Sequence, residues 1–221
     1  GPIRTEESQA VLMNAFEHLK TLDFSAGATL DLINAAEVRG TEELKTAVAE
    51  FRKRQQESGT LLSLWNECLE GGDRERGRAL FFGRSAAACR RCHIVGGSGG
   101  EVGPDLSKVG KEKDRNYLLE AMVDPSAKIA KGFETVIIVT MEGKIHSGIL
   151  KSEDDSVVQL MTPTGALISV ARDDIDERAN GLSGMPQDIA KNLTRAEIRD
   201  LVEYLTTLQS EPAAPAHGKH E

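Results

Sequence analysis

Apolar residues recur three or four positions apart through the first 72 residues, which is the spacing of one face of an α-helix. Four short helices are predicted from this pattern. Ser25 is a candidate N-cap of the second helix, and Gly40 and Gly59 are stop signals for the second and third. Short helices with short connections favour a helical-hairpin array like the last repeats of a solenoid, although the sequence contains no clean internal repeat. The periodic apolar positions, helix by helix, are Val11, Leu12, Ala15, Phe16 and Leu19; Leu30, Ile33 and Ala36; Leu44, Ala47, Val48 and Phe51; and Leu61, Leu64, Trp65 and Cys68.

From Phe133 the period changes from helical to strand-like. Four β-branched runs, FETVIIVTM, KIHSGIL, SVVQLM and ALISV, are separated by turn signals such as Glu142-Gly143 and Thr164-Gly165. A fifth strand is expected around 172–175. Strands this short, joined by such tight turns, predict an antiparallel β-meander or, if the meander curls up, a small barrel.

The stretches on either side of these strands are helical again. A helix in GDRERGRALFF is followed by a cysteine–histidine motif, a glycine-rich loop and a helix near 115–123, and TRAEIRDLVEYLTTL is a strongly amphipathic helix after the strands. We therefore expect a mainly α fold with a small β insertion. Its predicted parts are a helical repeat-like segment (1–72), a domain formed by 73–130 and 179–210, an inserted β-rich subdomain (131–178) and a disordered tail (211–221).

Charge and composition narrow the range of partners. The net charge is −8, yet residues 73–130 carry 11 basic and 8 acidic side chains. This does not fit a nucleic-acid binder, which is basic over a whole face; it fits a site that holds an anionic group or docks an acidic partner, or simply a solvated helix surface. No apolar run approaches the ~18 residues that span a bilayer. Aromatic residues are only 4% of the chain, so a large cofactor pocket would be lined mainly by aliphatic side chains.

Cys89, Cys92 and His93 form the pattern C-x-x-C-H, the attachment signature of c-type haem. Two thiols two residues apart on a short helix can add to both vinyl groups of one porphyrin, and the adjoining imidazole can then ligate the iron. Three other interpretations compete. A structural zinc site needs four ligands, and no second C-x-x-C is present to supply them. A redox dithiol is expected after a strand of a βαβ unit, and no strand is predicted there; the third alternative is a chance occurrence.

Four further features, in the right order along the chain, make this sequence resemble class I cytochromes c. Gly77-x-x-x-Phe81 lies in the helix before the motif, Gly103-Pro104-Asp105-Leu106 follows the motif, Met185-Pro186 precedes the last helix, and DLVEYL (Asp200–Leu205) resembles the family's C-terminal helix. In the family, the first and last helices cross at the glycine, where a missing side chain lets two backbones approach closely.

The resemblance implies one covalently bound haem c. Cys89 and Cys92 would anchor the porphyrin, and His93 and Met185 would be the axial ligands of the iron. In the family, the proline carbonyl accepts the Nδ1–H of the histidine and the leucine packs on the haem. The other positions assigned to the haem site are Gly103, Pro104 and Leu106 and, in its apolar wall, Leu80, Phe81 and Leu182.

The β-rich insertion is a departure from ordinary small cytochromes. Together with YLLEAMVDPSAKI before it, it resembles the haem-binding domain at the C-terminal end of long planctomycete and verrucomicrobial proteins assigned as dehydrogenases. The resemblance covers 73–209 well and 1–72 loosely. It implies an electron-transfer domain rather than an enzyme, which accepts electrons from a dehydrogenase module of the same polypeptide and passes them to another redox protein. Because haem is attached covalently outside the cytoplasm, a periplasmic or otherwise extracytoplasmic location is expected.

The sixth iron ligand separates this function from its alternatives. Met185 lies in a loop stiffened by a neighbouring glycine and proline, whereas Met122, Met141 and Met161 fit core positions of a helix and two strands. A displaced or labile Met185 would instead favour a haem peroxidase or a gas or redox sensor. A further alternative is an interaction module in which the β-rich segment is the working part.

Cys68 is the odd cysteine of the chain. Its helical spacing with neighbouring apolar residues predicts a small buried hydrophobe. The alternative is an intermolecular disulfide in an oxidising compartment, and a homodimer is left open. The histidines outside the motif, His18, His146, His217 and His220, are not expected to ligate iron.

Overall fold

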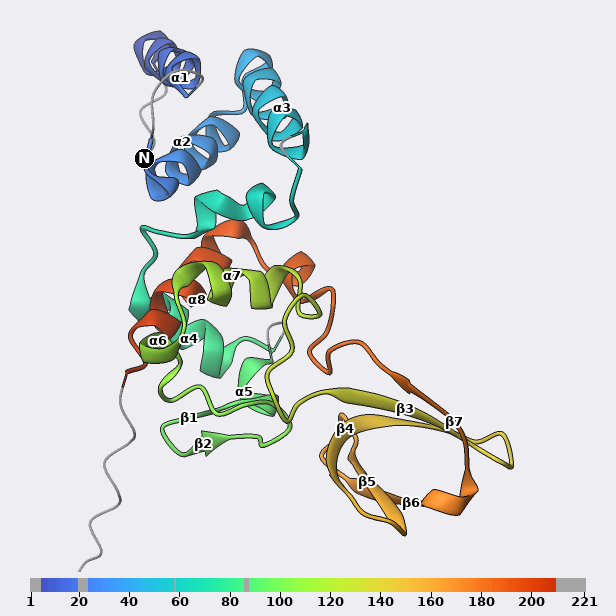
Figure 1. Ribbon diagram of the computed structural model, residues 1–221. Helices are drawn as coiled ribbons and strands as arrows, with labels where there is room; N and C mark the ends of the chain where they lie inside the picture. The colour runs from blue at the N-terminus through green and yellow to red at the C-terminus, as the bar shows by residue number, and fades with distance from the viewer. Residues whose placement is uncertain (1–4, 20–23, 58, 86–87, 210–221) are drawn as a thin grey trace, which may run out of the picture.

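The computed structural model describes residues 5–19, 24–57, 59–85 and 88–209 (Figure 1). Helices form the larger part of it, a two-stranded sheet lies beside them, and a five-stranded antiparallel sheet extends from one side. This architecture agrees with the expected helical protein that carries a small β insertion. The predicted disordered tail at 211–221, with His217 and His220, lies outside the described residues.

The N-terminal segment begins with three α-helices. Ser25 caps the second helix as predicted, because its side chain accepts the Ala28 N–H at 3.3 Å, and Gly40 ends that helix with a φ of 70°. The segment closes with a 3-10 helix in place of the predicted fourth α-helix. The elements are α1 (Glu6–His18), α2 (Ala26–Arg39), α3 (Glu42–Glu57) and η1 (Leu62–Cys68).

The inward faces of these helices agree largely with the predicted apolar positions. Phe16, Ile33, Ala36 and Leu44 form a buried cluster between α1, α2 and α3. Val11 is an exception, since it is 66% exposed.

Helix η1 differs from the prediction because of the spacing of its buried residues. Leu62, Trp65 and Cys68 all pack on the main core of the protein, and they are three positions apart. A 3-10 helix has three residues per turn, so this spacing places all three on one face.

The main core is built from helices that flank the large sheet in sequence. Its fully buried members include Leu119, Ile198, Leu201 and Val202. Among the described residues, no helix is both long and apolar enough to cross a membrane. The elements before the sheet are α4 (Arg74–Gly83), α5 (Cys89–Cys92), β1 (Ile94–Val95), β2 (Ser98–Gly99), α6 (Val109–Glu112) and α7 (Arg115–Val123); those after it are η3 (Ile189–Asn192) and α8 (Arg195–Thr206).

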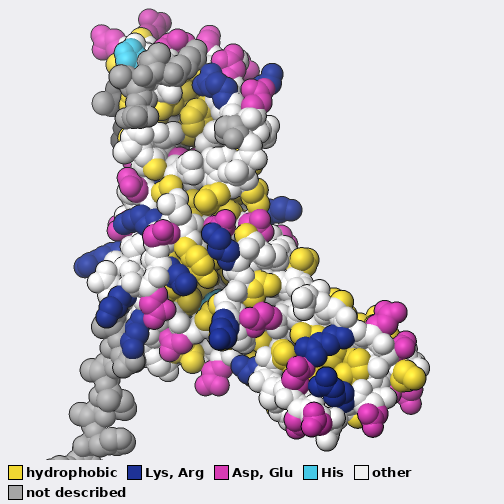
Figure 2. Space-filling model, viewed as in Figure 1, with side chains coloured by type: hydrophobic (Ala, Val, Ile, Leu, Met, Phe, Trp, Pro, Cys, Tyr) yellow, Lys and Arg dark blue, Asp and Glu magenta, His cyan; other side chains and the backbone are white. Residues whose placement is uncertain are grey.

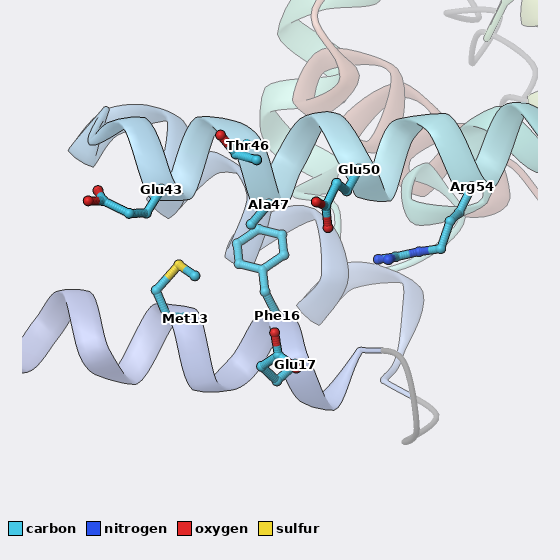
Figure 3. Close-up of a pocket in the computed structure, with 8 residues that line it drawn as sticks. All are labelled: Met13, Phe16, Glu17, Glu43, Thr46, Ala47, Glu50 and Arg54. Carbon is cyan, nitrogen blue, oxygen red and sulfur yellow. The ribbon is translucent and has the colours of Figure 1, made fainter.

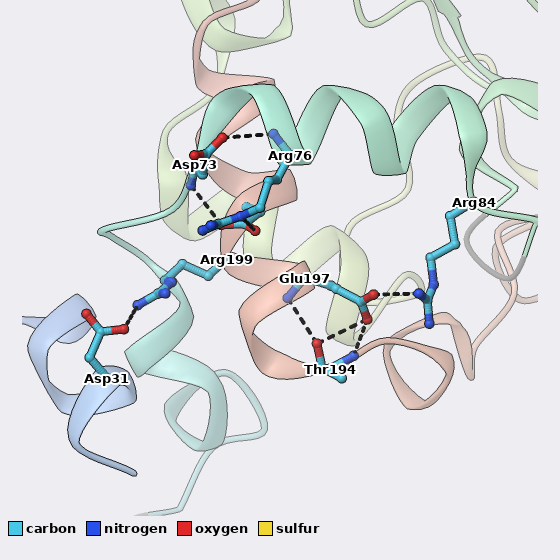
Figure 4. A network of polar contacts seen from close by, with 8 residues as sticks. Asp31, Asp73, Arg76, Arg84, Thr194, Glu197 and Arg199 are labelled. Atoms are coloured by element: carbon cyan, nitrogen blue, oxygen red, sulfur yellow. Dashed lines mark hydrogen bonds and ion pairs between the residues drawn. The ribbon is translucent and has the colours of Figure 1, made fainter. Parts of the chain in front are cut away.

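Helices α4 and α8 cross at Gly77. A Cβ at this position would lie 2.0 Å from the Asp200 carbonyl oxygen and 2.7 Å from the Cβ of Tyr204, so no side chain fits. The buried Asp200 carboxylate accepts hydrogen bonds from the Asp73 N–H at 2.7 Å and from the Arg76 guanidinium at 2.8 Å. Figure 4 labels the two donor residues, Asp73 and Arg76. The close crossing expected at Gly77 is confirmed.

Helix α8 also holds the N-terminal helices. Its Arg199 side chain is only 7% exposed and pairs with Asp31 of α2 at 2.7 Å (Figure 4). The Glu67 carboxylate of η1 is almost fully buried and pairs with Arg195 of α8 at 2.6 Å and with Arg52 of α3. Because a buried charge is costly unless it is paired, these contacts fasten α2, α3 and η1 to the C-terminal helix.

The five-stranded sheet has the strand order β6-β5-β4-β3-β7, with every neighbouring pair antiparallel. The first four strands follow the predicted meander. The fifth begins at Ile175, after a short 3-10 turn, rather than near Arg172, and it continues to Asn180, beyond the predicted end of the insertion. The strands are β3 (Thr135–Thr140), β4 (Ile145–Glu153), β5 (Val157–Met161), β6 (Leu167–Ala171) and β7 (Ile175–Asn180), and the turn is η2 (Arg172–Asp174).

The sheet is strongly bent (Figure 1), but β6 and β7 remain its two edges, so strand pairing does not close it into a barrel. Register shifts in the β3–β7 and β4–β5 pairs, which are typical of β-bulges, accompany this bend. The sheet has a core of its own, formed by Val136, Ile138, Val158, Leu160 and Val170.

Charge is unevenly spread over the face seen in Figure 2. Lys and Arg side chains gather over the middle of this face, whereas acidic side chains outnumber basic ones at the end formed by α1–α3. This distribution follows the count of 11 basic and 8 acidic side chains in residues 73–130.

The Gly77 crossing is tested by comparing two glycine substitutions in α4. Gly77→Ala is expected to lower the free energy of unfolding by at least about 2 kcal/mol, because the new Cβ forces two backbones apart. Gly83→Ala is the matched control, since a Cβ there meets nothing within 4 Å. It should change stability by less than about 1 kcal/mol. Urea unfolding measures both, and equal effects would contradict the contact.

Candidate functional site

A cavity of about 350 Å³ lies between α5, α7, the loop before η3 and the five-stranded sheet. Cys89, Cys92 and His93 line it together with Met185, which comes from a distant part of the chain. The lining is mostly apolar. Because few residues of the chain are aromatic, we expected a large pocket to be lined mainly by aliphatic side chains. The other sequence-selected positions in the lining are Gly103, Pro104 and Leu106.

The glycine-rich loop after α5 folds back on that helix. It forms the hairpin of β1 and β2, whose turn residues Gly96 and Gly97 have φ of 62° and 76°. Two successive positive φ values are typical of a type I′ turn, which favours glycine. The Gly103 N–H then donates to the Cys92 carbonyl at 2.7 Å, so the chain returns to α5 immediately before the proline.

This return brings the Pro104 carbonyl oxygen to 2.9 Å from Nδ1 of His93, the contact that the resemblance implied. Because a carbonyl can only accept, the ring carries its proton on Nδ1 and leaves the Nε2 lone pair available to a metal. Burial lowers the pKa of His93, and the hydrogen bond to Pro104 opposes this shift. The imidazole is therefore neutral at neutral pH, the form that ligates metals.

Gly103 has a steric role at the same place. A Cβ at this position would lie 2.6 Å from Cε1 and 2.8 Å from Nδ1 of His93. With the ring where it is, only glycine fits. The backbone of Gly103 therefore forms one side of the cradle of the imidazole.

The two cysteines of the motif do not resemble a reactive dithiol. Burial raises the pKa of the Cys89 thiol to about 11. Redox-active C-x-x-C pairs have a lowered pKa instead. Among the described residues, no group of three or more His, Cys, Asp or Glu side chains is placed to hold a metal ion between them.

Met185 is held in its loop by a small hydrogen-bond network. Its N–H donates to Ser183 Oγ at 3.2 Å, and its carbonyl accepts from Gln187 Nε2 at 3.1 Å. Ser126, just after α7, joins the two sides of this loop: its Oγ accepts the Ser183 N–H and donates to Gln187 Oε1, each at 3.0 Å. The loop between β7 and η3 (residues 181–188), called the methionine loop below, is thus fixed to the end of α7.

Phe81 and Leu182, two positions expected in the apolar wall, do not line the cavity. Phe81 is 2% exposed and its ring centroid lies 5.8 Å from that of Tyr204 on α8. It lies four residues after Gly77, hence on the same helical face, and that face packs on α8. Leu182 is 67% exposed. Leu80 packs on the main core and also lies outside the lining.

Several lining residues were missed by the sequence analysis. Met122 had been assigned to the helix core, and it is buried there, yet it also lines the cavity. Arg91 and Lys128 are the charged residues of the lining, and no acidic residue is in it, as far as the described residues extend. Three more come from the insertion and its entry: Phe133, Ile149 and Pro163. In a single sequence, an apolar residue that lines a cavity has the same pattern as one in a core.

Cys68 is a buried residue of the main core, as its spacing predicted. It is 0% exposed, and burial raises the pKa of its thiol to about 12. An intermolecular disulfide through Cys68 does not fit this position.

A second cavity, of about 190 Å³, lies between α1 and α3 (Figure 3). Met13, Phe16 and Ala47 form its apolar side, and its rim is polar, with Glu17 and Glu50 among its residues. As far as the described residues extend, its lining contains no cysteine or histidine and none of the residues that the sequence singled out for chemistry. The larger cavity is therefore the candidate functional site.

No protein-family model matches this chain, and no curated protein matches it. We therefore infer the function from the residues that line the cavity.

The cradle of His93 is tested with Gly103→Ala. The new methyl group should push the imidazole off the Pro104 carbonyl and lower stability by about 1 kcal/mol or more. NMR of the imidazole nitrogens should find the Nδ1–H tautomer in the wild type and lose it in the variant. Val102→Ala, in the same loop, should keep it. Retention of that tautomer in Gly103→Ala would contradict the contact.

Burial of Cys68 predicts protection from alkylation. With a pKa raised to about 12, the folded protein should not be modified at Cys68 by iodoacetamide at pH 8, because both thiolate and access are missing. In urea the residue should react fully. Peptide mapping by mass spectrometry measures both, and rapid labelling of Cys68 in the native protein would show that the site is open.

Proposed function

We propose that this chain is a mono-haem c-type cytochrome domain that transfers single electrons. The observation that carries the proposal is the meeting of Cys89, Cys92, His93 and Met185 at one largely apolar cavity. The finer description of the fold, a cytochrome c fold interrupted by a β-rich insertion, belongs to this proposal.

The residues at the cavity fit such a group. Cys89 and Cys92 lie on a short helix and are separated by two residues, as attachment to two vinyl groups requires. When bound, haem c supplies an iron that alternates between Fe(III) and Fe(II). His93 presents Nε2 while Pro104 holds its other nitrogen, which orients the ring and raises its basicity.

Met185 and the lining set the electronic properties of the site. A thioether ligand favours Fe(II), so a His/Met pair raises the reduction potential compared with two nitrogen ligands. Leu106 and Met122 are apolar residues of the lining that would keep water away from a bound haem. Arg91 and Lys128 give the lining a positive charge, which suits a cofactor with acidic substituents.

The proposed partners follow from the resemblance of the sequence. The electron donor would be a dehydrogenase module of the same polypeptide, and the acceptor another redox protein. Covalent haem attachment would place the protein in the periplasm or another extracytoplasmic compartment. The domain would be a carrier and not itself an enzyme.

The proposal is tested by producing the chain in the periplasm of a bacterium with cytochrome c maturation machinery. The wild type should carry haem that stays attached after denaturation, and the Cys89→Ala/Cys92→Ala double variant should lose it. Met185→Ala should lose the thioether-to-iron charge-transfer band of the oxidised protein and have a lower reduction potential. Met122→Ala is the matched control, since Met122 also lines the cavity, and it should keep the band.

Other outcomes would change the assignment. Loss of the band in Met122→Ala alone would make Met122 the ligand. A wild type without the band, whose reduced form binds CO rapidly, would favour a peroxidase or a gas sensor. A wild type without attached haem would refute the proposal.

A further inference from the structure

The insertion contributes to the cavity at three separate points. Phe133 lies just before β3, Ile149 lies in β4, and Pro163 lies in the turn between β5 and β6, and all three line the cavity. The same turn lies near the loop after the C-x-x-C-H motif: Pro163 and Val102 line the same cavity, and a Cβ built on Gly165 would lie 3.8 Å from Val102 Cγ2. The sheet therefore contacts the site over a broad face, not only at its two chain connections.

The methionine loop begins where the sheet ends. Asn180, the last residue of β7, pairs with Val136 of β3, and the Gly181 N–H donates to the Thr135 carbonyl at 2.8 Å. A Cβ at Gly181 would lie 2.8 Å from Thr135 Cγ2, so the loop backbone is pressed against β3. The start of the loop is thus fixed four residues before Met185.

Ile149 supports the same loop from the next strand. It pairs with Thr135 across the β3–β4 ladder, and its Cδ1 lies 3.7 Å from the position that a Cβ on Gly184 would occupy. Gly184 directly precedes Met185. The end of the Ile149 side chain therefore lies beside the backbone that presents the sulfur.

Ile149 is buried outside the two cores that the sheet and the helices form. It is 5% exposed, yet it belongs neither to the core of the sheet nor to the main core of the helices. Its neighbour Leu150 packs on the sheet core, and successive residues of a strand point to opposite faces. The side chain of Ile149 thus lies on the face turned to the cavity.

We propose that the inserted sheet is a wall of the haem site and that Ile149 is a positioning residue, which holds the Gly184-Met185 backbone in place and keeps water from the sulfur. This inference rests on the proposed function. It gives the insertion a role in keeping Met185 bound to the iron. This role is distinct from the docking of a partner protein.

The test compares two buried isoleucines of the same sheet in the haem-loaded full chain. Ile149→Ala removes the contact to Gly184, whereas Ile138→Ala opens a void in the sheet core, away from the cavity. Both should lower the melting temperature. Only Ile149→Ala should weaken the thioether-to-iron band, lower the reduction potential and bind imidazole about tenfold more tightly to the oxidised iron, as a 1.4 kcal/mol loss of methionine retention requires.

A milder pair keeps the comparison measurable if an alanine variant does not fold. Ile149→Val removes the Cδ1 atom nearest Gly184, and Ile138→Val is its control. Ile149→Val should tighten imidazole binding about threefold, which corresponds to about 0.65 kcal/mol and lies within the usual cost of an Ile→Val change in a core. Ile138→Val should leave imidazole binding unchanged.

Three results would separate this inference from the proposed function. A wild type that has the band, together with an Ile149→Ala variant whose band, potential and imidazole affinity match it, would overturn the positioning role alone. The same holds if Ile138→Ala and Ile149→Ala change these three quantities equally. A wild type without the band would instead remove the proposed function itself.

Discussion

At Gly77 the backbone of α4 touches the backbone of α8 with no side chain between them. Helix α4 leads directly to the C-x-x-C-H motif, and α8 follows the loop that carries Met185. Bringing these two helices into contact therefore brings together the two halves of the site, although 91 of the 221 residues lie between His93 and Met185. The buried Asp200 carboxylate, which accepts from both Asp73 and Arg76, fixes the angle of this crossing.

The β-rich insertion does not disturb the contact between α4 and α8, because the chain enters and leaves the insertion at the same place. Its first strand, β3, and its last, β7, are antiparallel neighbours in the sheet. The chain therefore comes back beside the point where it left, and the flanking helices need not move to accommodate five strands. Such a connection can grow or shrink while its two ends stay in register.

Much of the site could be predicted from residues whose chemistry depends on spacing. Cys89, Cys92 and His93 are recognisable because the pattern itself is the signal, and Gly77 because a helix interior rarely tolerates glycine without a packing reason. Pro104 could be placed through the resemblance, and the Gly96-Gly97 turn explains how it returns to His93. The meander of the sheet followed from tight turn signals.

Other residues could not be predicted, since their roles depend on distant contacts. Ile149 and Met122 look like ordinary core residues in the sequence, and only the packing of the sheet and of α7 brings them to the cavity. Phe81 was placed in the wall because the family pattern says nothing about which way α4 is turned. The 3-10 form of η1 depends on the surface it covers, and local propensity does not encode that surface.

The buried Glu67 bears on where one foldable unit ends and the next begins. By sequence resemblance, the chain divides near residue 73. The ion pairs do not respect this boundary. The carboxylate of Glu67 pairs with Arg195 of the last helix, and Arg199 of that helix pairs with Asp31. A fragment cut at the resemblance boundary would leave two arginines of α8 without their counterions on a newly uncovered apolar surface. The N-terminal helices are thus physically part of the unit that they precede.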